Sequence, residues 1–128
     1  MTKIDCTCYI VGEGFSPSAA EKRTGLVFVK KEEPGELATF GPYSGKPVPF
    51  GMGTLEFNGI RDCSSPEFLR WLTDIKKSLP LFKEWGADDI SLDFIVAYKY
   101  QCNLEAEPAF FLALARLGIP VSLSCWED

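Results

Sequence analysis

The sequence predicts an α+β fold: a two-layer sandwich in which helices pack on one face of a mixed or antiparallel sheet. Three observations in the last third of the chain predict it. Apolar and polar residues alternate over residues 90–100, an apolar run begins at Pro108 and ends at Gly118, and a second alternating stretch covers residues 119–125. This order indicates a strand, a helix and a strand in direct succession.

The first part of the chain predicts three short elements. Alternation over residues 3–11 indicates a strand, with its cysteines on the apolar face. Ser16 and Pro17 form a helix start, because serine caps helix N-termini and proline suits the first helical position. Gly25 ends this helix, and residues 26–29 are expected to form a short strand.

Residues 30–53 are predicted to form a long loop. Its charge run is followed by closely spaced glycines and prolines, which interrupt regular structure, although a brief strand is expected near residues 37–40. The segment Gly51-Met52-Gly53 is expected to be a turn. A strand follows over residues 54–58. Long loops inside compact domains often carry function.

The second half opens with an amphipathic helix that begins at Ser65 and Pro66. Pro80 is expected to end it, with residues 81–85 as a separate helical turn. The helix from Pro108 is apolar nearly all round and is therefore expected to be deeply packed. In the helix that begins at Ser65 and Pro66, the apolar residues recur at helical spacing: Phe68, Leu69, Leu72, Ile75 and Leu79.

Length and composition predict one α/β domain over residues 1–128, with 46% hydrophobic residues for its core. The net charge of −5 argues against nucleic acid or an anionic membrane as partner and is compatible with a basic protein. The chain has no apolar run near the ~20 residues that span a membrane and no signal-peptide core at its start. A cytoplasmic location is expected.

The chain contains no histidine, which removes the commonest general base and the histidine-dependent nucleophile pairs and metal sites. Its five cysteines are odd in number and irregularly spaced, so a disulfide framework is not expected. Cys6 and Cys8 could join other thiols around zinc, but the usual Cys-x-x-Cys pairs are missing and buried thiols are favoured. We expect no enzymatic activity, no cofactor and no metal.

The polar faces of the predicted strands supply candidate partner-binding residues. Asp93 lies in the middle of a strand, where acidic residues are depleted, and Trp126 is expected to be exposed, as binding hot spots often are. The alternative is simple solvation of an open sheet face. The candidates are Tyr9, Asp93, Lys99 and Trp126.

Several segments together resemble the uncharacterised bacterial family DUF4279. They are residues 9–17, the short helix that reaches Gly25-Leu26, the helix around Trp71-Leu72, and the stretch from Cys102-Asn103-Leu104 through Pro108 and Leu117-Gly118-Ile119 to residues 122–124. The resemblance implies a small cytosolic α/β domain, with some relatives acting as immunity proteins against bacterial toxins. It implies no functional residues.

The first hypothesis is therefore a non-enzymatic protein-binding module, in its sharper form an immunity-type inhibitor that blocks a basic toxin or effector. The alternative is a small-ligand-binding or sensor domain, with a pocket between the sheet and the loop of residues 30–53. Three aromatic side chains would close that pocket: Phe40, Tyr43 and Phe50. An edge strand near either terminus could also pair between chains and give a homodimer.

Overall fold

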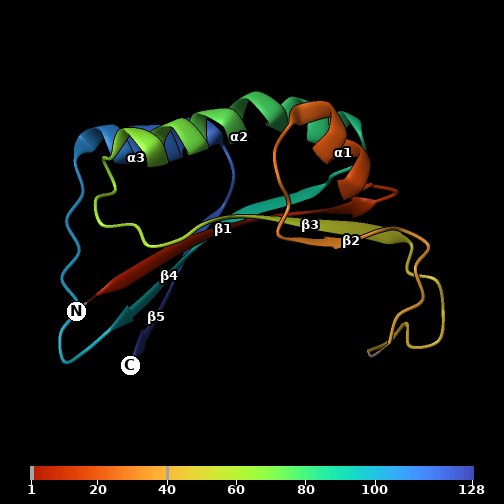
Figure 1. The fold of residues 1–128 in the computed structure, drawn as a ribbon, viewed down its shortest axis with the longest axis horizontal. Coiled ribbons are helices and arrows are strands. Elements are labelled where there is room, and N and C mark those ends of the chain that lie inside the picture. The colour runs from red at the N-terminus through yellow and green to blue at the C-terminus, as the bar shows by residue number, and fades with distance from the viewer. Residues whose placement is uncertain (1, 40) are drawn as a thin grey trace. The chain divides into compact units, whose positions relative to one another are not determined.

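The computed structural model describes residues 2–39 and 41–128, and it confirms the α+β fold, with one mixed sheet and helices packed on it (Figure 1). The strand order is β2-β3-β1-β4-β5, with β2 antiparallel to β3 and β5 parallel to β4. In chain order the elements are β1 (Lys3–Glu13), α1 (Pro17–Thr24), β2 (Lys30–Glu32), β3 (Phe50–Phe57), α2 (Pro66–Glu84), β4 (Asp89–Tyr98), α3 (Pro108–Leu117) and β5 (Val121–Glu127).

The chain divides into two compact units that are interleaved in sequence. Unit 2 consists of Tyr9–Leu55 and Leu79–Ile90, and unit 1 of residues 2–8, Glu56–Ser78 and Ser91–Asp128. Strands β1, β3 and β4 and helix α2 each contribute residues to both units. Each unit is described by itself below.

The core of unit 1 is a cluster of aromatic rings around Phe68, a fully buried residue of α2. Its ring centroid lies 5.3 Å from that of Phe57 on β3 and 6.0 Å from those of Phe94 on β4 and Phe110 on α3. Trp71 stacks on it at 5.9 Å. Such aromatic pairs add to the free energy gained from burial alone, so Phe68 joins both helices of unit 1 to the sheet.

The predicted strand, helix and strand of unit 1 are confirmed as β4, α3 and β5. Helix α3 ends where predicted, because Gly118 adopts the left-handed conformation with φ = 67°. The seven-residue parallel register places Phe94 opposite Leu123 and Val96 opposite Cys125. These side chains therefore share one face of the sheet, the face that carries Phe110 of α3.

Unit 2 packs around Phe82, near the end of α2. Its ring centroid lies 6.1 Å from those of Phe15 and Phe28, and all three side chains are buried. The predicted bounds of α1 are confirmed, with the Ala19 N–H donating to Ser16 Oγ at 3.2 Å. Ser16 Oγ in turn donates to a carboxylate oxygen of Glu33 at 2.7 Å, which fixes the start of the helix.

The prediction that Pro80 ends the helix is wrong, because α2 continues through it to Glu84. A proline inside a helix removes one backbone hydrogen bond and crowds the preceding turn. The buried residues Leu79 and Phe82 lie on either side of Pro80, and their burial offsets this cost. The separate turn expected for residues 81–85 is the last part of the same helix.

The predicted turn at residues 51–53 is also wrong, since these residues belong to β3. A Cβ on Gly51 would collide with the backbone oxygen of Phe15, and one on Gly53 would lie 2.6 Å from the ring of Phe28. The two glycines therefore mark the close approach of other segments to the strand.

The short strand expected over residues 26–29 begins four residues later, at Lys30, where it pairs with β3. Residues 26–29 form no strand, and β2 instead covers the charged segment Lys30–Glu32, with Lys30 opposite Thr54. Charged side chains suit the edge of a sheet, which this strand forms. The strand expected near residues 37–40 is reduced, in the described part of that range, to isolated bridges at Leu37 and Ala38.

Candidate functional site

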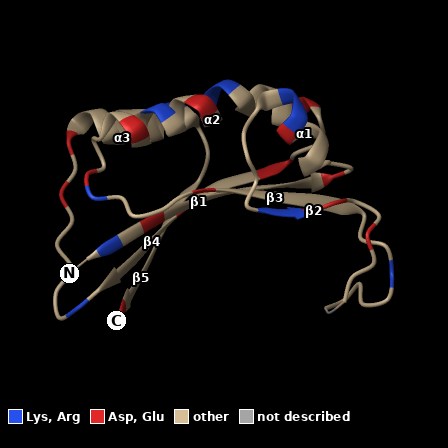
Figure 2. Ribbon diagram, viewed as in Figure 1, with Lys and Arg blue, Asp and Glu red and all other residues tan. Residues whose placement is uncertain are grey.

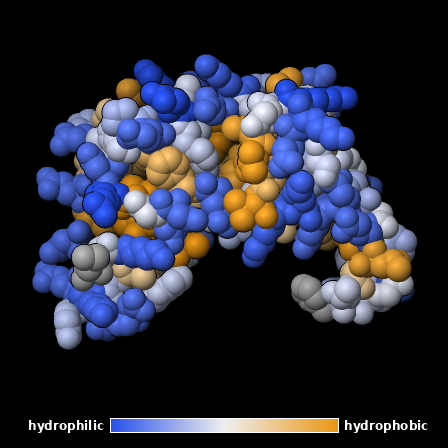
Figure 3. Space-filling view, viewed as in Figure 1, coloured by the Kyte–Doolittle hydropathy of each residue, from blue (hydrophilic) through white to orange (hydrophobic). Residues whose placement is uncertain are grey.

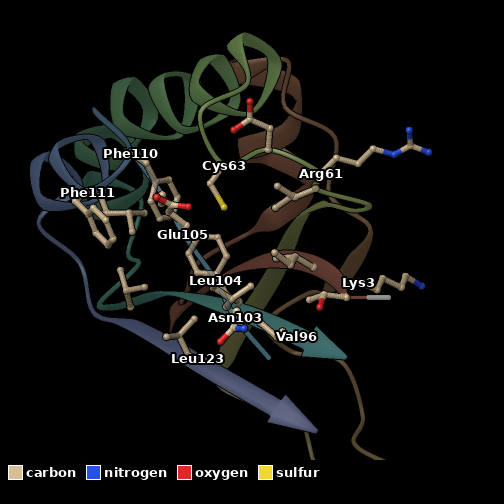
Figure 4. Close-up of a pocket in the computed structure, with 18 of the residues that line it drawn as sticks. Lys3, Arg61, Cys63, Val96, Asn103, Leu104, Glu105, Phe110, Phe111 and Leu123 are labelled. Atoms are coloured by element: carbon tan, nitrogen blue, oxygen red, sulfur yellow. The ribbon is translucent and has the colours of Figure 1, made fainter. Parts of the chain in front are cut away.

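A large pocket opens within unit 1, between the sheet and the elements that follow β4 (Figure 4). Its volume is about 1040 Å³, at the upper end of the range for small-molecule sites. Strands β4 and β5, helix α3, the segment before α3 and the segment after β3 all contribute to its wall. The main apolar side chains of the wall are Phe94, Val96, Leu104, Phe110, Phe111 and Leu123.

Four large apolar side chains at this pocket are exposed, and we call them the apolar rim: Leu104, Phe111, Val121 and Leu123. The exposed fraction reaches 59% for Phe111 and 65% for Leu123. The prediction that α3 is deeply packed is therefore wrong: only Phe110 and Leu117 of this helix are buried. Apolar side chains reach the surface below the helices of unit 1, at the left of Figure 3.

Helix α3 exposes its apolar residues because it covers an edge of the sheet. Every residue of β5 is exposed, so the strand beneath the helix buries none of its own side chains. One stripe of the helix packs on the cluster around Phe68, and no described segment covers the remaining apolar side chains. An exposed apolar group of this kind is typical of a binding surface.

Two cationic side chains, Lys3 and Arg61, stand at the edge of the pocket and extend away from it, whereas Cys63 points toward its interior (Figure 4). Lys3 lies 3.9 Å from the carboxylate of Asp5. Asp5 also accepts a hydrogen bond of 2.8 Å from the Gly59 N–H, which anchors the segment after β3. The wall is mainly apolar, and its charged side chains include Asp62 and Glu105 besides Lys3 and Arg61.

Three thiols of unit 1, of which Cys63 lines the pocket, are poorly suited to nucleophilic chemistry. Burial raises the pKa of Cys8 to about 12. Burial, and next the charge of Cys8, raises the pKa of Cys6 further, while burial followed by the charge of Asp62 raises the pKa of Cys63. The thiolate is the reactive form. Cys6 and Cys8 are fully buried and are not joined in a disulfide, as expected for structural thiols.

The buried thiols predict a loss of stability at high pH. Below pH ~8.5 the thiols are protonated in both the folded and the unfolded state, and they contribute fully to the free energy of unfolding. As the pH rises, thiols of the unfolded state ionise first, while Cys8 stays protonated in the folded state up to about pH 12. The free energy of unfolding should therefore fall across this interval, by at most about 1.4 kcal/mol per pH unit for each thiol.

Chemical denaturation at a series of pH values measures this fall. The matched variant carries Cys6→Ala and Cys8→Ala, which removes the titrating groups and leaves the lysines and tyrosines in place. Its free energy of unfolding should decline less steeply than that of the original chain. Equal slopes would show that other groups cause the decline.

Among the predicted partner-binding residues, Asp93 has a structural role in the sheet. Its Oδ1 accepts hydrogen bonds from the hydroxyls of Ser122, at 2.8 Å, and Ser124, at 3.2 Å. The carboxylate therefore joins β4 to β5 on the face opposite the pocket. Trp126 is exposed on the same face, opposite Ala97 in the register.

The other two candidates, Lys99 and Tyr9, do not belong to the group formed by Asp93 and Trp126. Lys99 follows the end of β4 in unit 1, and Tyr9 is a half-buried residue of unit 2. Neither lines the pocket. The structure thus brings together Asp93, its two serine partners and Trp126 on one face of the β4–β5 pair.

The aromatic residues of the predicted ligand loop are partly described. Phe40 lies outside the described residues. The rings of Tyr43 and Phe50 contact each other edge to face, with centroids 5.9 Å apart. The pocket described above includes no residue of the 30–53 segment, so it differs in place from the pocket that the sequence suggested.

Sequence reasoning missed the apolar rim, although one signal pointed to it. Helix α3 is only 10 residues long and apolar nearly all round, and it precedes a strand at the edge of the sheet. A helix of this kind cannot bury all its sides against one strand and one neighbouring helix. The surplus apolar side is the rim.

Comparisons of the chain with known protein families, with curated proteins and with solved structures find no match. In the described part of the chain, no helix has the combined length and apolar character needed to cross a membrane. Among the same residues, no group of three or more cysteine, aspartate or glutamate side chains is placed to hold a metal ion.

Proposed function

We propose that this chain is a non-catalytic protein-binding module whose contact surface is the apolar rim of unit 1. The observation that carries the proposal is the exposure of four large apolar side chains around one pocket. Scattered exposed apolar residues are common, but a group that surrounds a cavity is typical of interaction sites. The raised pKa of Cys63, a thiol that lines the pocket, is also more consistent with binding than with catalysis.

In its sharper form, the module is an immunity-type inhibitor that covers a functional site of a basic toxin or effector. The net charge of −5 favours a basic partner, because opposite charges accelerate association and disfavour wrong partners. The resemblance to DUF4279 supports the same proposal. Inhibition would follow from occlusion of the partner.

Variants of the rim test the proposal. The full chain is immobilised, retained proteins are identified, and each candidate partner is purified for calorimetric titration. Phe111→Ser and Leu123→Ser should each weaken binding by about tenfold or more, because central apolar contacts dominate interface energetics. The matched control is Val27→Ser, which removes another exposed apolar side chain, in unit 2 (76% exposed), and should leave the affinity unchanged.

Two further variants separate the rim from the polar sheet face. Asp93→Lys and Trp126→Ala alter the face opposite the pocket. If Asp93→Lys and Trp126→Ala abolish binding while the rim variants bind normally, the contact surface is the face opposite the pocket. Retention of no specific protein by the original chain would refute the proposal as a whole.

The volume of the pocket supports a second candidate function, the binding of a small apolar ligand. About 1040 Å³ accommodates a ligand of drug size, and the mainly apolar wall suits an apolar ligand. Thermal denaturation in the presence of a set of small apolar molecules tests this function. A rise in Tm that Phe111→Ser abolishes, without a protein partner, would favour it.

A further inference from the structure

We propose that the partner of this module supplies an extended segment, apolar at alternate positions and flanked by basic residues, which pairs with the outer edge of β5. This inference rests on the proposed function and names the class of partner. It follows from the backbone of β5, from the composition of that strand and from the charges near it.

The backbone of β5 has one edge paired and one edge open. Strand β5 ends the strand order of the sheet, and among the described residues it pairs with β4 alone. Pro120 O accepts a hydrogen bond of 2.9 Å from the Leu92 N–H, and the Asp128 N–H donates to Tyr98 O at 2.6 Å. Even-numbered residues therefore direct their backbone groups toward β4, and odd-numbered residues direct theirs outward.

The outward N–H groups of Leu123 and Cys125 are thus ready donors for another strand. The inner edge is held in place by the seven-residue register with β4 and by the Asp93 carboxylate, which bonds both Ser122 and Ser124. A strand fixed in this way loses little conformational entropy when another segment pairs with it.

The two edges of the sheet differ in composition (Figure 2). Edge strand β2 consists of Lys30, Lys31 and Glu32, and charged side chains discourage pairing with other chains. Edge strand β5 carries neither charge nor proline over its first six residues and has its acid at the end, Glu127. The β5 edge therefore lacks the features that would prevent strand addition.

The side chains beside the open edge define what an added strand must present. Val121, Leu123 and Cys125 lie on the face that carries the pocket, next to Phe111 of α3. Alternate side chains of an added strand would lie beside this apolar row. Apolar residues at every second position would thus extend the apolar rim, as in other strand-addition complexes.

The charges that follow β4 favour a basic partner over a second copy of this chain. Residues 99–128 carry four acidic side chains and two basic ones. A second copy would bring the same acidic surplus, whereas lysine or arginine beside the apolar segment of a partner would compensate it. The acidic residues are Glu105, Glu107, Glu127 and Asp128, and the basic ones are Lys99 and Arg116.

The probe for this inference is a capped peptide with a lysine at each end and alternating threonine and valine between them. It is titrated into the full chain, and amide hydrogen exchange is followed by NMR. Binding should slow exchange at the N–H groups of Leu123 and Cys125. A peptide with glutamate in place of both lysines should bind about tenfold more weakly.

A pair of variants at one position isolates the backbone contribution. Cys125→Pro removes an outward N–H without touching the inner ladder, a position at which proline is tolerated in edge strands. Cys125→Val changes the side chain but keeps the N–H. Peptide affinity should fall in the proline variant and persist in the valine variant, with the Tm of each recorded to confirm folding.

The alternatives give different results. Equal peptide affinity of the two variants, or peptide-induced shifts at the pocket without protection of the Leu123 and Cys125 amides, would overturn strand addition. Protection of these amides that depends on protein concentration alone would assign the edge to a second copy. If Phe111→Ser abolishes binding to a purified partner and Cys125→Pro does not, the proposed function stands and this inference fails.

Discussion

Replacing Phe68 with alanine is expected to lower the free energy of unfolding by about 3–5 kcal/mol, the cost typical of removing a large buried aromatic side chain. Phe68 is fully buried and contacts four other aromatic rings, from α2, α3, β3 and β4. The surrounding rings belong to different elements, so they cannot all move into the space that the substitution leaves. Urea denaturation followed by far-UV circular dichroism measures the effect.

Phe111→Ala is the matched control, because Phe111 is the same residue type and is 59% exposed on α3. Its substitution should change the free energy of unfolding by no more than about 0.5–1 kcal/mol. A Phe68→Ala cost as small as that of the control would show that the aromatic cluster does not hold unit 1 together. Phe68→Leu should cost less free energy of unfolding than Phe68→Ala, because leucine fills most of the volume of the phenylalanine side chain.

Replacing Gly12 with alanine is expected to have the second largest effect, a loss of about 1–3 kcal/mol or more. A Cβ at this position would overlap the carbonyl oxygen of Gly86 and lie 2.6 Å from the Cα of Ala87. Both obstacles are backbone atoms, so no rotation of a side chain can relieve the overlap. The Asp88 N–H also bonds Val11 O at 3.0 Å, which ties the two segments together at this point.

The neighbouring residue Glu13 provides the comparison for Gly12. Its side chain is exposed, and Glu13→Ala should leave the Tm within a few degrees of the original value. Thermal denaturation of the two variants therefore separates a general sensitivity of the end of β1 from the steric effect at Gly12. Similar Tm values for both variants would contradict the steric argument.

The elements that the sequence predicted well are those with local signals at both ends. Helices α1 and α3 begin at Pro17 and Pro108 and end before Gly25 and Gly118, as expected from proline at the first helical position and left-handed glycine after the last. These preferences act over one turn of chain and need no knowledge of the rest of the fold. Alternation similarly identified β1 and β4, within two residues at each end.

The errors arose where distant contacts decide the local structure. Pro80 stays within a helix because Phe82 packs on Phe15 and Phe28, and β3 tolerates Gly51 and Gly53 because other segments cross it there. Neither contact is visible in a local pattern. The pocket could not be predicted for the same reason, because its wall joins segments from both ends and the middle of the chain. The exposure of β5 depends on its place at the edge of the sheet, which no local pattern shows.

The position of β1 in the strand order has a consequence for how the chain acquires its structure. Strand β1 is the central strand of the sheet, and both of its neighbours, β3 and β4, come later in the chain. The pairing of β1 on both sides is therefore complete only after β4, the later of its two neighbours, has left the ribosome. Pairing between such distant segments slows folding, so protection of β1 by a chaperone during synthesis should raise the yield of folded protein.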